Sequence, residues 1–154
     1  MSICPFKNAT YLNESWADDL TRRCLAKCSA LSYSFTNTTH NVCLNTCPTG
    51  FYASISKKSC LDQCPLGSYA HIPSKTCVDQ CPPGLWADLI GRICKSDCKF
   101  NISLYADDSS GACVDKCPTY PDLYADTVAQ KCVLTCPPNT YAYNITRKCV
   151  SDCP

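Results

Sequence analysis

The residues best suited to chemistry in this chain are its cysteines, which number 17 among 154 residues, about 11%. Thiols at this density form disulfides or, in a reducing compartment, bind zinc. Every close pair has the spacing Cys-x3-Cys, whereas zinc sites mostly use Cys-x2-Cys or Cys-x4-Cys and commonly add histidine. The two histidines, His40 and His71, lie far apart and in expected turns. The pattern therefore favours disulfides and predicts no metal site.

No other set of residues has the pattern of a catalytic site. The acidic pairs Asp18-Asp19 and Asp107-Asp108 fall in expected turns and lack the spacing of an EF-hand loop. The net charge is +1 with no run of like charges, and no apolar run approaches the roughly 18–20 residues that span a bilayer. We therefore expect no enzyme activity, no cofactor, no nucleic-acid partner and no membrane insertion by this segment.

The cysteines follow an internal repeat. Apart from Cys4, they form eight Cys-x3-Cys pairs whose first members recur every 17 or 19 residues. An aromatic residue stands eight positions before each first cysteine, and alanine follows it in every case except Phe35-Thr36. Only the distance from the second cysteine to the aromatic varies: the aromatic stands five positions after the cysteine in four modules and seven positions after it in three. We expect these aromatics to pack on the disulfides: Trp16, Phe35, Tyr52, Tyr69, Trp86, Tyr105, Tyr124 and Tyr141.

The constant half of each module predicts a β-hairpin, with the aromatic-Ala strand, a polar turn and a return strand that reaches the cysteine. A basic residue often stands six after the aromatic, and the pairs Asp18 with Arg22 and Asp88 with Arg92 are expected across the hairpin. The variable half often begins Cys-Pro-x-Gly, which suggests a type I turn.

The repeat narrows the many possible cysteine pairings. A bond inside Cys-x3-Cys would leave the hairpin unlinked, whereas joining the second cysteine of one pair to the first of the next encloses each hairpin. Cys153 is left without a partner inside the chain. The predicted bonds are Cys4–Cys24, Cys28–Cys43, Cys47–Cys60, Cys64–Cys77, Cys81–Cys94, Cys98–Cys113, Cys117–Cys132 and Cys136–Cys149.

Segments such as Cys77-Val-Asp-Gln-Cys81-Pro-Pro-Gly-Leu-Trp86-Ala resemble the furin-like repeats of growth-factor-receptor cysteine-rich domains. They are also similar to the first module of tumour-necrosis-factor-receptor repeats, and the uniform array is similar to cysteine-rich surface proteins of protists. In the simplest modules of both receptor families the next cysteine closes a loop that starts at Cys-Pro. This chain lacks the two-disulfide modules that alternate in those receptors, so their ligand-binding residues are not transferred.

The expected fold is a small disulfide-rich repeat protein in which short β-hairpins stack end to end as an extended rod. A module of 17–19 residues cannot bury its own core, and each disulfide loop contributes roughly 3 kcal/mol in the chain-entropy model. The eight modules are 4–24, 28–43, 47–60, 64–77, 81–94, 98–113, 117–132 and 136–149. Cysteines at both ends suggest a window on a longer array.

Five N-x-S/T sequons occur in inserts, spacers or turns, and they predict N-glycans on Asn8, Asn13, Asn37, Asn101 and Asn144. Disulfides and sequons together predict an extracellular or cell-surface location. Two functions remain open. The first is a structural rod that serves as stalk, coat or fibre subunit, with neighbouring modules or subunits of the same protein as partners. The alternative is a receptor or adhesin ectodomain that binds a protein or glycan.

Overall fold

The computed structural model describes residues 16–36 and 41–153. The chain divides into two structural units, residues 1–78 and 79–154. In the described ranges all regular structure is β-strand, and each strand has three or four residues. The tandem disulfide-rich hairpins that the sequence predicts are therefore confirmed.

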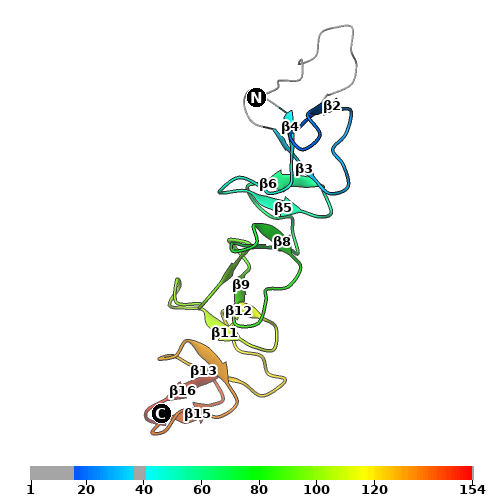
Figure 1. Ribbon diagram of the computed structural model, residues 1–154. Helices are drawn as coiled ribbons and strands as arrows, with labels where there is room; N and C mark the ends of the chain where they lie inside the picture. The colour runs from blue at the N-terminus through cyan, green and yellow to red at the C-terminus, as the bar shows by residue number, and fades with distance from the viewer. Residues whose placement is uncertain (1–15, 37–40, 154) are drawn as a thin grey trace. The chain divides into compact units, whose positions relative to one another are not determined.

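The first unit contains four hairpins, which follow one another in Figure 1 from β1/β2 to β7/β8. Each first strand pairs antiparallel with its own return strand. Within the unit, β1, β3 and β5 also pair parallel with the return strand of the next hairpin, as β3 does with β6. The strands are β1 (Trp16–Asp18), β2 (Arg23–Leu25), β3 (Tyr33–Thr36), β4 (Asn41–Leu44), β5 (Tyr52–Ser54), β6 (Ser59–Leu61), β7 (Tyr69–His71) and β8 (Thr76–Val78).

The second unit repeats this arrangement with four more hairpins. Parallel bridges join β9 to β12, β11 to β14 and β13 to β16. The strands are β9 (Trp86–Asp88), β10 (Ile93–Lys95), β11 (Tyr105–Asp107), β12 (Ala112–Val114), β13 (Tyr124–Asp126), β14 (Lys131–Val133), β15 (Tyr141–Tyr143) and β16 (Lys148–Val150). The end-to-end rod concerns the whole chain and stays a prediction.

The disulfides and the alanine that follows the aromatic recur in the core of each unit. In the register of the hairpins this alanine lies opposite the first cysteine, as Ala53 does opposite Cys60. Both residues are central in the ladder, because the alanine strand has a neighbour on each side. The buried alanines at this position are Ala17, Ala53, Ala70, Ala87, Ala106 and Ala125.

Seven of the predicted cysteine pairs are disulfides in the structure, with Cα–Cα distances of 5.4 to 5.6 Å. They join Cys28–Cys43, Cys47–Cys60, Cys64–Cys77, Cys81–Cys94, Cys98–Cys113, Cys117–Cys132 and Cys136–Cys149. Cys24 is also disulfide-bonded, and its predicted partner Cys4 lies outside the described residues. Cys153 is an exposed free thiol.

The strand register of the second hairpin corrects the position that the sequence predicts for the aromatic of this module. Tyr33 and Ser34 lie opposite Leu44 and Cys43, which is the register that the aromatic and alanine have in the other hairpins. The aromatic position is therefore Tyr33 and not Phe35. The two additional residues lengthen the hairpin by one strand pair, Thr36 opposite Asn41, and the segment after Cys28 has the short form.

The Cys-Pro-x-Gly corner also differs from the expected type I turn. The proline carbonyl accepts a hydrogen bond from the residue after glycine, as in Phe51 N to Pro48 O at 3.0 Å. Proline is thus the first residue of the turn and glycine the third. Gly50 has φ of 84°, which is the left-handed conformation that a type II turn requires at its third residue. Asn139, in the equivalent position, adopts φ of 63°.

The disulfide pattern can be tested by peptide mapping under non-reducing conditions. We expect Cys64 linked to Cys77 and Cys81 linked to Cys94, because these bonds close the hairpin loops at unstrained Cα distances. Thiol-blocked, unreduced material supplies the map, and a reduced sample is the control. Links inside Cys-x3-Cys pairs would contradict the assignment.

Candidate functional site: the joint between consecutive hairpins

One backbone hydrogen bond recurs between neighbouring hairpins. The N–H of the alanine in one hairpin donates to the carbonyl of the last turn residue in the next hairpin, over 2.8 to 2.9 Å. Ser34 occupies the alanine position in the second module and makes the same bond to Lys58 O. The other such bonds are Ala53 to Lys75, Ala87 to Gly111, Ala106 to Gln130 and Ala125 to Arg147.

The accepting residue has a left-handed backbone in each described case. It stands six after the aromatic, and its φ lies between 51° and 65°. This conformation costs roughly 1–2 kcal/mol for a residue with a Cβ. Seven described residues at this position adopt it, and only one of them is glycine. The cost is compatible with a structural need for the joint bond. The five accepting residues are Lys58, Lys75, Gly111, Gln130 and Arg147, and Arg22 and Arg92 have the same backbone conformation at the equivalent position.

This geometry corrects the cross-strand pairing expected for the aspartates. Asp18 lies opposite Arg23, and Asp88 lies opposite Ile93, so Arg22 and Arg92 are turn residues and not strand partners. The aspartates instead accept hydrogen bonds inside their own turns. Asp88 Oδ1 accepts from the N–H groups of Ile90 and Gly91, each at 3.0 Å.

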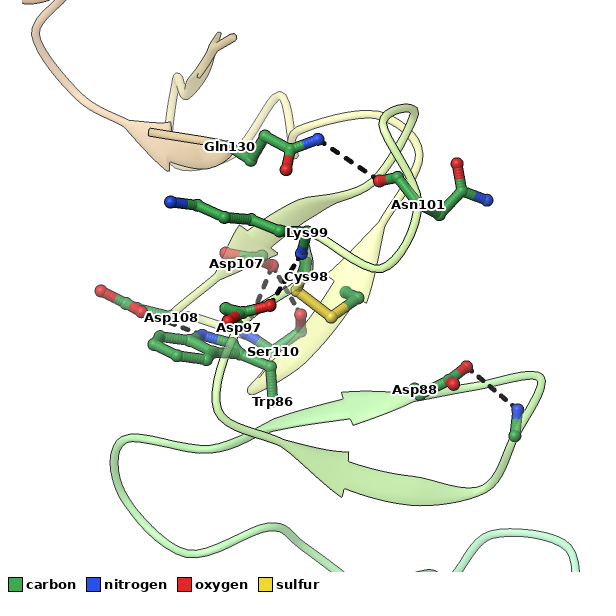
Figure 2. Close-up of a disulfide and its surroundings, with 12 residues drawn as sticks. Trp86, Asp88, Asp97, Cys98, Lys99, Asn101, Asp107, Asp108, Ser110 and Gln130 are labelled. Carbon is green, nitrogen blue, oxygen red and sulfur yellow. Dashed lines mark hydrogen bonds between the residues drawn. A yellow bond between two sulfur atoms is a disulfide. The ribbon is translucent and has the colours of Figure 1, made fainter. Parts of the chain in front are cut away.

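The most enclosed of these turn aspartates is Asp107, with a fully buried side chain. Its carboxylate accepts hydrogen bonds from the backbone and the hydroxyl of both Ser109 and Ser110. Burial alone would raise its pKa, but the hydrogen bonds from Ser110 and Ser109 outweigh burial and place the pKa below the ordinary value. Figure 2 shows Asp107 and Ser110 in this contact. The charged carboxylate therefore holds the turn.

The second part of the joint is an aromatic ring that packs on the disulfide of the following hairpin. Tyr105 packs in a cluster with Cys117 and Cys132. Trp86 packs in the same way against Cys98 and Cys113, and Figure 2 shows Trp86 and the disulfide of Cys98. Tyr33 and Phe35 pack against the Cys47–Cys60 disulfide. In these clusters the ring of one hairpin covers the disulfide of the following hairpin, so each module stabilises its neighbour.

Burial of the predicted aromatics is uneven. Tyr105 and Tyr124 are buried, whereas Tyr141 is 58% exposed, so Tyr141 does not fill the packing role that the sequence predicts. Its strand β15 pairs with β16 and has no second neighbour in the described ladder. The half-buried aromatics are Trp16, Phe35, Tyr52, Tyr69 and Trp86.

The third part of the joint is a cation that lies over the ring. The Lys58 ammonium lies 5.6 Å from the centroid of Tyr33, and the Arg147 guanidinium lies 4.6 Å from that of Tyr124. Both cations belong to the left-handed residue whose carbonyl accepts the joint bond. The basic preference at this position thus has a physical reason, since a long side chain there can fold back over the preceding ring.

Arg147 also binds the long spacer of the preceding module. It donates to the carbonyls of Pro118 and Leu123 at 2.9 and 2.6 Å and forms an ion pair with Asp122. The hydrogen bond from Arg147 lowers the pKa of the Asp122 carboxyl below its ordinary value. Tyr124 donates to Asn144 Oδ1 at 2.6 Å. Here the left-handed residue fixes the spacer as well as the strand.

A further polar link spans three hairpins of the second unit. The Trp86 indole N–H donates to Asp108 Oδ1 at 3.1 Å, a contact visible in Figure 2. Asp108 pairs with Lys131 at 2.8 Å, and the Lys131 ammonium lies 5.7 Å from the Trp86 ring centroid. Asp108, in the turn of its own hairpin, thus binds one residue of the preceding hairpin and one of the following hairpin.

The candidate chemical groups do not assemble in the described part of the chain. His71 is the last residue of β7 and not a turn residue as expected, and its Nδ1 is hydrogen-bonded to Ser74 Oγ at 2.7 Å. His40 lies outside the described residues. No three potential metal-ligating side chains come together in residues 16–36 and 41–153. None of these described segments forms a helix of the length and apolarity needed to cross a membrane.

Two of the predicted glycosylation sites can be placed. Asn101 is exposed, and its Oδ1 accepts a hydrogen bond from Ser103 N at 3.0 Å, within its own sequon. Asn144 is exposed at the tip of the last hairpin. Both positions are accessible to a glycosylating enzyme. Asn8, Asn13 and Asn37 lie outside the described residues.

Comparisons with known proteins return no match: no protein-family model, no curated protein and no solved structure matches this chain.

The ring-on-disulfide contact can be tested with a matched pair of substitutions. Tyr105→Ala removes a ring that is 4% exposed and should cost about 3–5 kcal/mol, because it leaves a cavity beside Cys117–Cys132. Tyr141→Ala changes the same motif position where the ring is exposed and should cost less than about 0.5 kcal/mol. Thermal and denaturant unfolding measure both. Equal losses would show that ring burial does not stabilise the joint.

Asp107 predicts a pH dependence of stability. Its folded pKa lies below the unfolded value of about 3.9, so its stabilising effect is complete above that pH and is lost as the pH falls through the folded pKa. Asp107→Asn should therefore lower the melting temperature at pH 7 and approach the parent protein at acidic pH. The control is Asp115→Asn, an exposed aspartate outside the hairpin turns. A difference for Asp107→Asn that does not change with pH would contradict the role of its charge.

Proposed function

We propose that this chain is an extracellular structural protein, a glycosylated array of disulfide-linked hairpins that serves as a stalk, coat or fibre subunit. The observation that carries the proposal is the recurrent joint. The bond to a left-handed carbonyl is made five times in the described residues, four times by alanine and once by Ser34. Repeated bonding of one kind builds length, and nearest-neighbour contacts are typical of linear repeat proteins.

The disulfides support the location. Seven bonds within residues 28–149 are typical of a protein from an oxidising compartment, either secreted or at a cell surface. The exposed sequons at Asn101 and Asn144 fit the same location. On this proposal the chain has no enzyme activity and needs no cofactor besides its covalent glycans. Its partners are further modules or subunits of the same protein.

A second function is favoured by one observation in the first unit. A groove of about 460 Å³ lies beside Trp16, Lys27 and Lys57, in the part of the array where the first modules depart from the common repeat. Such a groove supports a receptor or adhesin ectodomain that binds a glycan. The furin-like and tumour-necrosis-factor-receptor resemblance belongs with this alternative, since those repeats occur in receptors.

The structural role can be tested on secreted, glycosylated protein. We expect a longest dimension of roughly 80–105 Å from small-angle scattering, because eight hairpins of about 10–13 Å each would add along one line. A compact globule of this length would instead have a radius of gyration near 15 Å, about that of ordinary domains. Enzymatic deglycosylation with mass spectrometry should report glycans at Asn101 and Asn144. A globular profile would contradict the stalk or fibre role.

A further inference from the structure

The groove of the first unit is formed by three successive modules. Trp16 comes from β1, Lys27 and Ser29 from the segment between β2 and β3, Ser34 from β3, and Lys57 and Lys58 from the turn before β6. Its volume of about 460 Å³ is within the range of small-molecule pockets. The pairing of β1 with β4 and the joint bond from Ser34 to Lys58 connect these modules and therefore also fix the walls of the groove.

The groove is positively charged. Three of the residues that line it are lysines, and none of the described lining residues is acidic. The sequence from residue 20 to residue 61 contains five basic residues and no aspartate or glutamate. No ion pair is formed by Lys27 or Lys57 with a described carboxylate. Two ammonium groups on the groove are thus available to a ligand anion.

Lys58 has a different part in the groove. Its ammonium donates to Ala30 O at 2.9 Å and lies over the Tyr33 ring, and its carbonyl accepts from Ser34 N. These contacts fix Lys58 as part of the wall. The half-buried Trp16 supplies the apolar surface, since an indole presents a flat face together with an N–H donor.

The combination of lysines occurs once in the array. The position three after the first cysteine of a pair is Lys27 here, but in the other modules it is Thr46, Gln63, Gln80, Asp97, Lys116, Thr135 or Asp152. Adjacent lysines five and six after the strand aromatic occur only as Lys57-Lys58. The joint does not require either feature, because the other modules form it without them.

We propose that this groove binds an anionic saccharide, with a sulfate or carboxylate between the ammonium groups of Lys27 and Lys57 and a sugar ring against Trp16. Charge-assisted hydrogen bonds from two lysines give affinity for the anion, and the indole face adds contact with the sugar. The site goes beyond the structural role proposed above and deepens the alternative of a glycan-binding ectodomain. If the chain does not bind the sugar, this site is refuted and the proposed structural role is unaffected.

The test uses the glycosylated full chain and a sulfated uronate–glucosamine disaccharide as probe. Trp16 and Trp86 give two indole N–H signals in nitrogen-15 NMR spectra, and Trp16→Phe assigns them. The probe should move the Trp16 signal and leave the Trp86 signal in place. The neutral disaccharide cellobiose should move neither, and inorganic sulfate at the same concentration should not displace the probe.

Replacement of the lysines supplies the second arm. Lys27→Gln and Lys57→Gln should each weaken binding roughly tenfold, and the double variant should weaken it roughly a hundredfold. The matched control is the double variant Lys99→Gln and Lys116→Gln, which removes the same charge from exposed residues of the second unit.

Several results would overturn the site. These are an unmoved Trp16 signal, equal loss in the control variant, binding of cellobiose with the same affinity, and displacement by sulfate alone, which would mean recognition of an anion only. Lys27 and Lys57 are exposed and outside the joint, so the variants should melt as the parent protein does. If they do not, the Trp16 signal of the parent protein decides.

Discussion

The structure depends on the hydrogen bond between an alanine N–H and the carbonyl of a left-handed residue in the next hairpin. A module of 17–19 residues is too short to enclose a core, so its disulfide and ring must be covered by a neighbour. The bond fixes the distance and register of that neighbour. Once it is made, the alanine strand has hydrogen-bonded strands on both sides, and in the described core clusters a ring such as Tyr105 lies on the adjacent disulfide. The small alanine side chain suits this crowded position, where Ala53, Ala87 and Ala125 are almost completely buried.

The left-handed residue also explains several preferences that lie apart in the sequence. It must end a short turn, and the residue that begins the turn is often an aspartate whose carboxylate accepts the N–H groups in between. Asp107 shows the strongest form of this arrangement, since its pKa is lowered despite burial. A long basic side chain at the left-handed position can return over the preceding ring, as Lys58 and Arg147 do. The turn conformation therefore explains both the aspartate and the basic residue, although the two do not lie opposite each other across the hairpin.

Much of the repeat could be predicted from the sequence because cysteine spacing and hairpin length are linked. The short strands and seven of the disulfide pairs follow from it. The second module could not be aligned correctly, because Phe35 has the expected distance to Cys43 and only strand register shows that Tyr33 and Ser34 take the equivalent positions. The left-handed backbone could not be predicted either, because arginine, lysine and glutamine do not indicate a positive φ, whereas glycine does. Likewise, nothing in the motif Tyr141-Ala142 distinguishes its exposed ring from the buried ring of Tyr105.

The joint between hairpins does not constrain every position, and the residues that can vary bear on function. The joint uses backbone groups, a disulfide and a ring, so residues beside the cysteines and within the turns can change without loss of the repeat. One such place carries Asp108, which binds Trp86 and Lys131 and links three hairpins. Another carries Lys27 and Lys57, which line a groove and have no carboxylate partner in the described chain. Both sets lie on the same scaffold at positions that the joint does not use. A structural array and a binding surface are therefore compatible in one chain, because stability comes from the recurrent contacts and specificity from the variable ones.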